Sequence, residues 1–227
     1  MTVSVGFYKK IREWVIGSSG EIDFRPFQVD GNPYKSRVFL VGAHPTPKID
    51  SESTSESVYI DSLVYGDLFE ELYGYQIVKQ SREYSGTLSF VQWMKQEFDE
   101  NVVVTYVNAL QTNSAEELKQ ARKQMPDAYF KGQQIFKEVV HEFQPDTIIL
   151  HGTQAVQQFR LLLDGQLIDD KASIDKVQHL EELGVFAEIQ LENGHKIQVL
   201  ACRSMRYFGK DGASFANFKE RIRELYV

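Results

Sequence analysis

The stretch from Ser36 to Pro47 constrains the fold most, because it reads as a buried strand that ends in a stiff loop. Its four consecutive apolar residues, Val38–Val41, predict a strand that is covered on both faces. Gly42 permits a sharp exit from the strand, and the two prolines that follow restrict the loop backbone. Ligands of an open parallel sheet bind beyond the carboxyl ends of its strands. The loop therefore places His44 in a candidate binding site.

The rest of the chain alternates strand-like and helical patterns. Further strands are predicted at residues 101–107, 147–150, 185–191 and 196–201. Asn193-Gly194 between the last two is a strong hairpin signal. Strands separated by helices indicate a parallel sheet with helices on both faces. We therefore predict one α/β domain over residues 1–227, with three α/β/α layers, a central, mainly parallel four-stranded sheet and an antiparallel edge strand.

The segment after the opening loop is harder to assign. Ser51–Ser57 is too polar to pack and is predicted to be a surface loop, with a lid over the site as the alternative. Apolar residues at helical spacing predict one helix over Leu63–Leu72 and another over Leu88–Phe98. The second of these helices is expected to follow a break at Ser85-Gly86-Thr87.

Composition narrows the class of protein. The 227 residues are 42% hydrophobic and 12% aromatic, which argues against disorder. The single cysteine, Cys202, excludes an internal disulfide and a cysteine-based zinc cluster, and the five histidines lack metal-binding spacing. No apolar run is long enough to span a bilayer, and the N-terminus lacks the apolar core of a signal peptide. We expect a soluble, cytoplasmic monomer with no metal, no cofactor and no membrane contact.

Charge is distributed unevenly along the chain. The net charge is −7, which does not favour nucleic-acid binding in bulk. From Lys196 onward, however, seven basic residues stand against three acidic ones, so this segment carries +4 and the remainder −11. Both a local basic face and a solvated helix face with mixed charges fit this pattern.

Polar residues follow four of the predicted strands, at the edge where ligands bind. They are His44 with Thr46, Asn108, His151, and Arg203 with Ser204 and Arg206. Each one alone has a structural explanation, such as a helix cap, an Asx-turn or a surface charge. Their convergence on one edge of the sheet favours a binding site instead.

In order and wording, these segments resemble the uracil-DNA glycosylase superfamily. Residues 32–45 resemble its first motif, and residues 107–112 are similar to the strand end whose asparagine reads uracil. Residues 147–155 resemble a later strand-glycine segment, and residues 202–209 are similar to its leucine loop. The resemblance covers residues 24–222 in the correct order and implies hydrolysis of an N-glycosidic bond in DNA, a DNA repair reaction, after base flipping.

The resemblance also implies roles for individual residues. The backbone of the loop formed by Gly42, Ala43, Pro45 and Thr46 would approach a base or a phosphate. Asn108 would pair with a pyrimidine edge, and Tyr59 is the candidate for aromatic stacking. Ser204 matches a serine that contacts a DNA phosphate, and Arg206 adds a positive charge beside it. Met205 or Tyr207 would supply the wedge that replaces the flipped base.

Two departures from the family pattern bear on activity. His44 stands where the family has its catalytic aspartate, and a neutral imidazole cannot supply a permanent negative charge. Cys202 stands where the family has its catalytic histidine, and a thiol is a weak donor. His44 as a base and Arg203 as a cationic donor are the candidate catalytic replacements.

Three functions remain open from the sequence. The first is a divergent glycosylase that acts on single- or double-stranded DNA. The second is a catalytically silent module that binds nucleic acid, a free nucleobase or another protein. The third keeps only the α/β core, with a site for a small nucleotide-like molecule.

Overall fold

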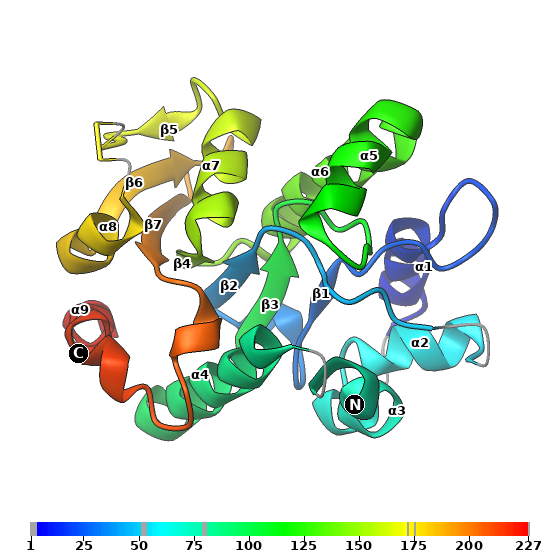
Figure 1. Cartoon of the computed structure of the whole chain (residues 1–227), viewed down its shortest axis with the longest axis horizontal. Coiled ribbons are helices and arrows are strands. Elements are labelled where there is room, and N and C mark those ends of the chain that lie inside the picture. Colours follow the sequence, from blue (N-terminus) through cyan, green and yellow to red (C-terminus); the bar gives the residue numbers. More distant parts are fainter. Residues whose placement is uncertain (1–3, 51–53, 79–80, 172, 175, 227) are drawn as a thin grey trace.

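The computed structural model describes residues 4–50, 54–78, 81–171, 173–174 and 176–226. Within these ranges the strands form one sheet in the order β1-β3-β2-β4-β7-β6-β5 (Figure 1). The strands are β1 (Phe27–Gln28), β2 (Val38–Gly42), β3 (Val102–Tyr106), β4 (Thr147–His151), β5 (Leu167–Ile168), β6 (Val185–Gln190) and β7 (Lys196–Cys202).

The centre of the sheet is parallel and its flanks are antiparallel. Strand β2 pairs in parallel with β3 and with β4, and β4 pairs in parallel with β7. Strands β1, β6 and β5 add to this centre in antiparallel register. The predicted α/β class is confirmed, but the predicted four-stranded sheet is wrong, because the described sheet has seven strands. Strands β1 and β5 have two residues each, too few for a sequence pattern to reveal.

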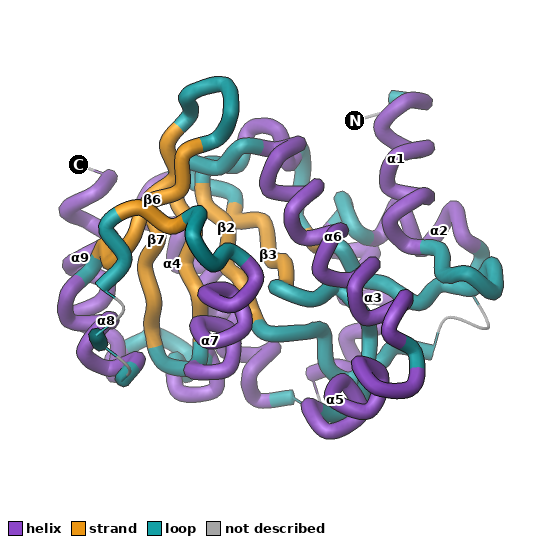
Figure 2. Tube along the Cα trace, turned by 90° about the horizontal axis from the view of Figure 1, so that it is seen from above, coloured by secondary structure: helices purple, strands orange, loops and turns teal. Residues whose placement is uncertain are grey.

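Helices of the described ranges cover both faces of the sheet. They are α1 (Val5–Val15), α2 (Glu56–Ser62), α3 (Gly66–Val78), α4 (Arg82–Phe98), α5 (Ala115–Gln124), α6 (Pro126–Phe143), α7 (Thr153–Leu162), α8 (Val177–Leu183) and α9 (Ala216–Tyr226). The described ranges also contain short 3₁₀ helices, with η1 (Pro33–Lys35) between β1 and β2, and η2 (Met205–Tyr207) and η3 (Ala213–Phe215) between β7 and α9. Helices α1, α2 and α3 gather beside β1, and α1 and α9 lie at opposite ends of the molecule (Figures 1 and 2).

Alternate residues of β2 divide the core into two layers. Val38 and Leu40 pack in one cluster with the apolar faces of α4 and α9. Phe39 and Val41 point the other way and join the larger cluster, which includes Phe143 of α6. This alternation is the side-chain period of a strand that is buried on both faces. The opening stretch of the sequence therefore forms the centre of the fold, as predicted.

The helices between β2 and β3 differ from the prediction. Residues 51–53 of the expected Ser51–Ser57 loop lie outside the described residues, and Ser55 caps α2 through a hydrogen bond to its side chain. The expected Leu63–Leu72 helix is present as α3, but it begins at Gly66 and continues to Val78, because the chain turns after Ser62. None of the helices in the described ranges is long and apolar enough to cross a membrane.

Helix α4 begins six residues before its predicted start. Ser85-Gly86-Thr87, taken from the sequence as a break, lies inside this helix. A Cβ atom on Gly86 would come within 1.9 Å of the Met205 carbonyl oxygen, so only glycine permits the contact between α4 and η2. The glycine is a packing device here and does not end the helix.

Candidate functional site

A polar pocket of about 440 Å³ lies at the carboxyl ends of the parallel strands. It is lined by His44, Thr46, Ser81, Arg82, Glu83, Tyr84, Thr87, Val104, Tyr106, His151 and Arg206. Strands β3 and β4 end at two of these residues, Tyr106 and His151, and His44 follows the end of β2. The first turn of α4 closes the pocket from the opposite side. The structure thus brings His44, Thr46, His151 and Arg206 together, as their places at the strand ends suggested.

Glu83 supplies the carboxylate of the pocket. Ser81 caps α4 by accepting a hydrogen bond from the Tyr84 amide at 3.1 Å, which sets Glu83 in the first helical turn. The Oε2 atom of Glu83 accepts a hydrogen bond of 2.6 Å from the Ser204 hydroxyl. Its Oε1 atom lies 3.6 Å from Nδ1 of His151. With 48% of its side chain exposed, Glu83 also faces the open pocket.

Two buried histidines flank this carboxylate. Burial lowers the pKa of His44 and the pKa of His151, and in both cases it outweighs the opposing effect of Glu83. Both rings are therefore neutral near pH 7. Among the described residues, neither nitrogen of His44 makes a well-aligned hydrogen bond, although the backbone of Ser114 lies close enough to favour the protonated ring. These rings can donate or accept a proton toward a bound molecule.

Gly42 permits the close approach of the strand ends. A Cβ atom at this position would lie 3.0 Å from Nε2 of His151 and 3.1 Å from Cδ1 of Tyr106. Those contacts are tighter than a side chain normally tolerates, so a larger residue would displace both rings. Gly42 therefore shapes the pocket by leaving space for its neighbours.

The loop after Gly42 uses much of its backbone to hold the next loop. The carbonyls of Gly42, Ala43 and Pro45 accept hydrogen bonds from the amides of residues 107, 108 and 112. This network aligns the ends of β2 and β3. These three carbonyls of the loop are engaged within the protein, and the predicted approach of the loop backbone to a base or a phosphate stays a prediction.

Two other predicted ligand-binding residues are also engaged internally. The Asn108 amide is fully buried, donating to the Tyr129 carbonyl at 3.1 Å and accepting from the Leu110 amide at 3.1 Å. The Tyr59 hydroxyl donates to the Phe24 carbonyl at 3.1 Å, and its ring is fully buried. Neither side chain lines the polar pocket. Their predicted roles toward a base stay predictions.

The segment after β7 splits into residues that reach the pocket and residues that do not. Arg203 donates to both carboxylate oxygens of Glu181, at distances of 2.9–3.1 Å, and to the Ser214 carbonyl. Met205 is fully buried against α4, whereas Tyr207 is 59% exposed. Burial raises the pKa of the Cys202 thiol well above its ordinary value, so this residue is no substitute for a catalytic histidine. Within this segment, Ser204 forms a hydrogen bond with Glu83, and Arg206 lines the pocket.

Sequence reasoning missed two charged residues, Glu83 in the pocket lining and the buried Arg25. Glu83 was hidden by the supposed break at Gly86, although Ser81 followed by an acidic residue is a helix-start signal. Arg25 was also missed. It has no exposed surface, and within the described ranges none of its three guanidinium nitrogens has a hydrogen-bond partner. A single cation between Phe24 and Pro26-Phe27 was the sequence signal for it.

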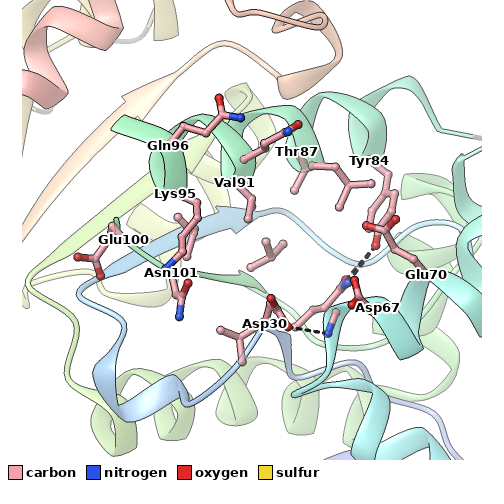
Figure 3. A pocket seen from close by; sticks show the side chains of 17 residues that line it. Asp30, Asp67, Glu70, Tyr84, Thr87, Val91, Lys95, Gln96, Glu100 and Asn101 are labelled. Atoms are coloured by element: carbon pink, nitrogen blue, oxygen red, sulfur yellow. Dashed lines mark hydrogen bonds between the residues drawn. The ribbon is translucent and has the colours of Figure 1, made fainter. Parts of the chain in front are cut away.

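Two further hollows adjoin the polar pocket. The first, of about 630 Å³, shares Tyr84 and Thr87 with it and runs along α4. Figure 3 shows Glu70 and Asp67 near Tyr84, and Asp30 also lines this hollow. The second hollow, of about 450 Å³, shares Arg206 with the pocket and includes the start of α7. The first hollow repels an anion, while the second has a cationic edge.

The described residues hold no group of three or more His, Cys, Asp or Glu side chains that could bind a metal ion. Comparison with known proteins finds no protein-family model that matches the chain and no curated protein that is significantly similar to it. The geometry of the pocket and the motif resemblance are therefore the grounds for assigning a function.

Proposed function

We propose that the protein hydrolyses an N-glycosidic bond of a nucleobase in nucleic acid, with Glu83 as the essential carboxylate. The observation that carries this proposal is the position of Glu83 between His151 and Ser204, at the strand ends where a ligand is expected. Sequence reasoning found no carboxylate in place of the family's aspartate. Glu83 offers one from a different element, helix α4.

The reaction needs a negative charge close to a sugar that becomes cationic. Glu83 can stabilise this oxocarbenium-like sugar and accept a proton from the attacking water. His151, 3.6 Å from Glu83, would orient the carboxylate, and the neutral His44 would hold the water or the base. A pocket of about 440 Å³ has the size of a small-ligand site and has room for one flipped nucleotide.

The nucleic-acid backbone would leave the pocket on the Arg206 side. Arg206 is exposed and lines both the pocket and the second hollow, where the N-terminus of α7 adds partial positive charge. The acidic hollow on the other side, with Asp67 and Glu70, would repel phosphates.

The experiment is a strand-cleavage assay. Oligonucleotides that contain uracil or hypoxanthine, single- and double-stranded, are incubated with the protein and treated with alkali. We expect cleavage, and a loss of at least about 100-fold in rate for Glu83→Gln, because the charge on the carboxylate is removed. Glu97→Gln is the matched control on the same helix, since Glu97 pairs with Arg223 outside the pocket. Cleavage that survives Glu83→Gln would contradict the role of Glu83.

A catalytically silent binding module is the second candidate. It is favoured by the internal hydrogen bonds of Asn108 and Arg203 and by the burial of Cys202, because these side chains are occupied by structural contacts. If the protein cleaves none of the oligonucleotides while a control enzyme is active in the same assay, this second candidate is favoured. It predicts salt-dependent oligonucleotide binding that weakens in Arg206→Ala.

A further inference from the structure

Two arginines in the lining of the polar pocket lack a carboxylate partner. Arg82, in the first turn of α4, and Arg206, in η2, are both exposed and both line the pocket. Neither forms an ion pair with a described residue, and the Arg206 guanidinium lies 5.9 Å from the ring centre of Tyr207. Ion pairs with a carboxylate are formed instead by Arg12, Arg37, Arg160, Arg203, Arg221 and Arg223. The pocket therefore offers two unpaired positive charges to a ligand.

The amino-terminal end of α4 opens onto the same pocket. Ser81 accepts a hydrogen bond from the Tyr84 amide through its side chain, at 3.1 Å, and one from the Ser85 amide through its carbonyl, at 3.3 Å. Among the described residues, the amides of Arg82 and Glu83 have no such acceptor. Unpaired amides at the start of a 17-residue helix carry partial positive charge and point toward a bound anion.

A buried histidine gives independent evidence for a polar ligand. His44 lines the pocket, is 9% exposed and makes no well-aligned hydrogen bond to a described residue through either ring nitrogen. A buried polar group without a partner is costly, so a ligand atom is a favourable partner for this ring. Because the ring is neutral, one of its nitrogens carries a hydrogen that it can donate to an anion.

One negative charge in the pocket opposes these groups. Glu83 also lines the pocket, but its Oε2 atom accepts a hydrogen bond from Ser204 and its Oε1 atom lies 3.6 Å from His151. Two guanidinium charges and the partial charge of the helix exceed this single negative charge. The pocket therefore suits an anion with more than one negative charge. A phosphate monoester, with a charge of about −1.5 to −2 at pH 7, is such an anion, whereas a phosphodiester carries a single charge.

The neighbouring hollows indicate that this phosphate is terminal. A strand that passed through the pocket would carry its phosphates away in two directions. One direction leads past Arg206 to the second hollow, which has a cationic edge. The other leads along α4 to the first hollow, where Asp67 and Glu70 repel phosphates. A nucleotide that has a neighbour on one side only, or none, avoids this repulsion.

We propose that the pocket binds the phosphate monoester of a nucleotide, with Arg82, Arg206 and the amino-terminal end of α4 around the phosphate. The inference rests on the proposed function for the nucleoside part, and it deepens that function by narrowing the substrate to a nucleotide with a terminal phosphate. The flat fork of each guanidinium matches two phosphate oxygens, and His44 adds a further donor. A free nucleoside monophosphate and the 5′-phosphorylated end of a strand share this chemistry.

The first test measures binding by calorimetry at pH 7.5. The ligands are deoxyuridine, its 5′-monophosphate and the methyl ester of that monophosphate. All are carbocyclic analogues, in which a methylene group replaces the ring oxygen of the sugar, so that no N-glycosidic bond can be hydrolysed. We expect the monophosphate to bind at least about 30-fold more tightly than the nucleoside and at least about fivefold more tightly than the methyl ester, which carries one charge less.

Substitution of Arg82 tests the site itself. Arg82→Gln should lose at least about tenfold in affinity for the monophosphate and keep its affinity for the nucleoside, because a charge-assisted contact to the phosphate is lost. Arg122→Gln is the matched control, since Arg122 is exposed, forms no ion pair with a described residue and lies outside the pocket lining. Thermal unfolding of each variant verifies that it folds.

A second titration distinguishes the two sources of the phosphate. It compares the free monophosphate with single strands that carry the same carbocyclic nucleotide at a 5′-phosphorylated end, at an unphosphorylated end or in the interior. Tighter binding of the phosphorylated end than of the free monophosphate identifies a strand end, and the reverse order identifies a free nucleotide; both results support the inference. An interior nucleotide that binds as tightly as the phosphorylated end would overturn it.

The outcomes also separate this inference from the proposed function. A preference for the monophosphate that falls in Arg82→Gln supports the inference even when no oligonucleotide is cleaved. Cleavage at interior uracil together with equal binding of the nucleoside and the monophosphate would overturn the inference and keep the proposed function. Equal binding of the monophosphate and its methyl ester, an unchanged preference in Arg82→Gln, or no binding of the monophosphate to the wild type would each overturn it as well.

Discussion

Arg203 and Arg25 lie in two regions of the molecule and differ in how their positive charges are paired. Arg203 meets Glu181 through several hydrogen bonds and donates to the Ser214 carbonyl as well. Arg25 is more deeply buried, yet no acceptor in the described part of the chain forms a hydrogen bond with its guanidinium. The sequence suggested the first as a catalytic cation and did not single out the second.

The difference shows that a cation near a strand end is informative only when its counter-ion is known. The Arg203–Glu181 pair is complete, so it serves to fix the segment after β7 against α8. Arg25 has no counter-ion among the residues that the structure describes, and such a charge is retained at a cost in stability. A cost of that kind is typical of binding sites.

The largest effect is expected from breaking the complete pair. Arg203→Ala should lower the free energy of unfolding by about 3 kcal/mol, because it leaves a nearly buried carboxylate without its cation. The Glu181 side chain is 9% exposed, so water cannot replace the lost partner well. Urea unfolding measures the change. Lys119→Ala breaks the exposed pair with Glu116 and should change stability by no more than about 0.5 kcal/mol. Equal effects of the two substitutions would remove the contrast between the two arginines.

Removing the incomplete cation should act in the opposite direction. Arg25→Met should raise the free energy of unfolding by about 2 kcal/mol, because the desolvation of a buried charge exceeds the cation–π attraction that offsets it. Urea unfolding is again the measurement, and Arg25→Lys, which keeps the charge, should show no such gain. A less stable Arg25→Met would mean that Tyr106 and Phe69 are sufficient partners for the guanidinium.

The smallest effect is a dependence of stability on pH. The pKa of His44 lies below its ordinary value of 6.5 in the folded state, so the unfolded state binds more protons as the pH falls. Stability contributed by the neutral ring is complete above about 6.5 and decreases toward the lower folded pKa. For one histidine the slope reaches about 1.4 kcal/mol per pH unit.

Urea unfolding between pH 5 and 8 checks this dependence. His44→Gln should reduce the slope, and Arg25→Met should reduce it less, because it removes one of the two causes that lower this pKa. His179→Gln, at an exposed position, is the control and should keep the wild-type slope. An unchanged slope in His44→Gln would show that the ring is not held neutral.

Much of the fold could be predicted because its signals are long and regular. The apolar run at Val38–Val41 and the Asn193-Gly194 turn identify strands by composition and local chemistry alone. The two-residue strands β1 and β5 escape such reasoning, because pairing with their neighbours creates them. Gly86 was wrongly interpreted as part of a helix break, since the sequence does not reveal that the Met205 carbonyl lies against this glycine.

Only part of the candidate site could be predicted, for a related reason. The sequence shows which polar residues stand at strand ends, and His44, His151 and Arg206 do meet in the pocket. It does not show which of these polar residues already have hydrogen-bond partners within the protein. The partners of Asn108 and Arg203 come from distant segments, at Tyr129 and Glu181, and become visible only in the folded chain.

The close contact at Gly86 also provides a way to recognise relatives of this protein. It holds α4 against η2, and the Ser204–Glu83 hydrogen bond joins the same two segments, which are 121 residues apart in the chain. A sequence that keeps the pocket must therefore keep a glycine three positions after the glutamate, together with a serine just beyond a later strand. This long-range pattern offers a search criterion for diverged sequences, in which the short motifs of a family are no longer legible.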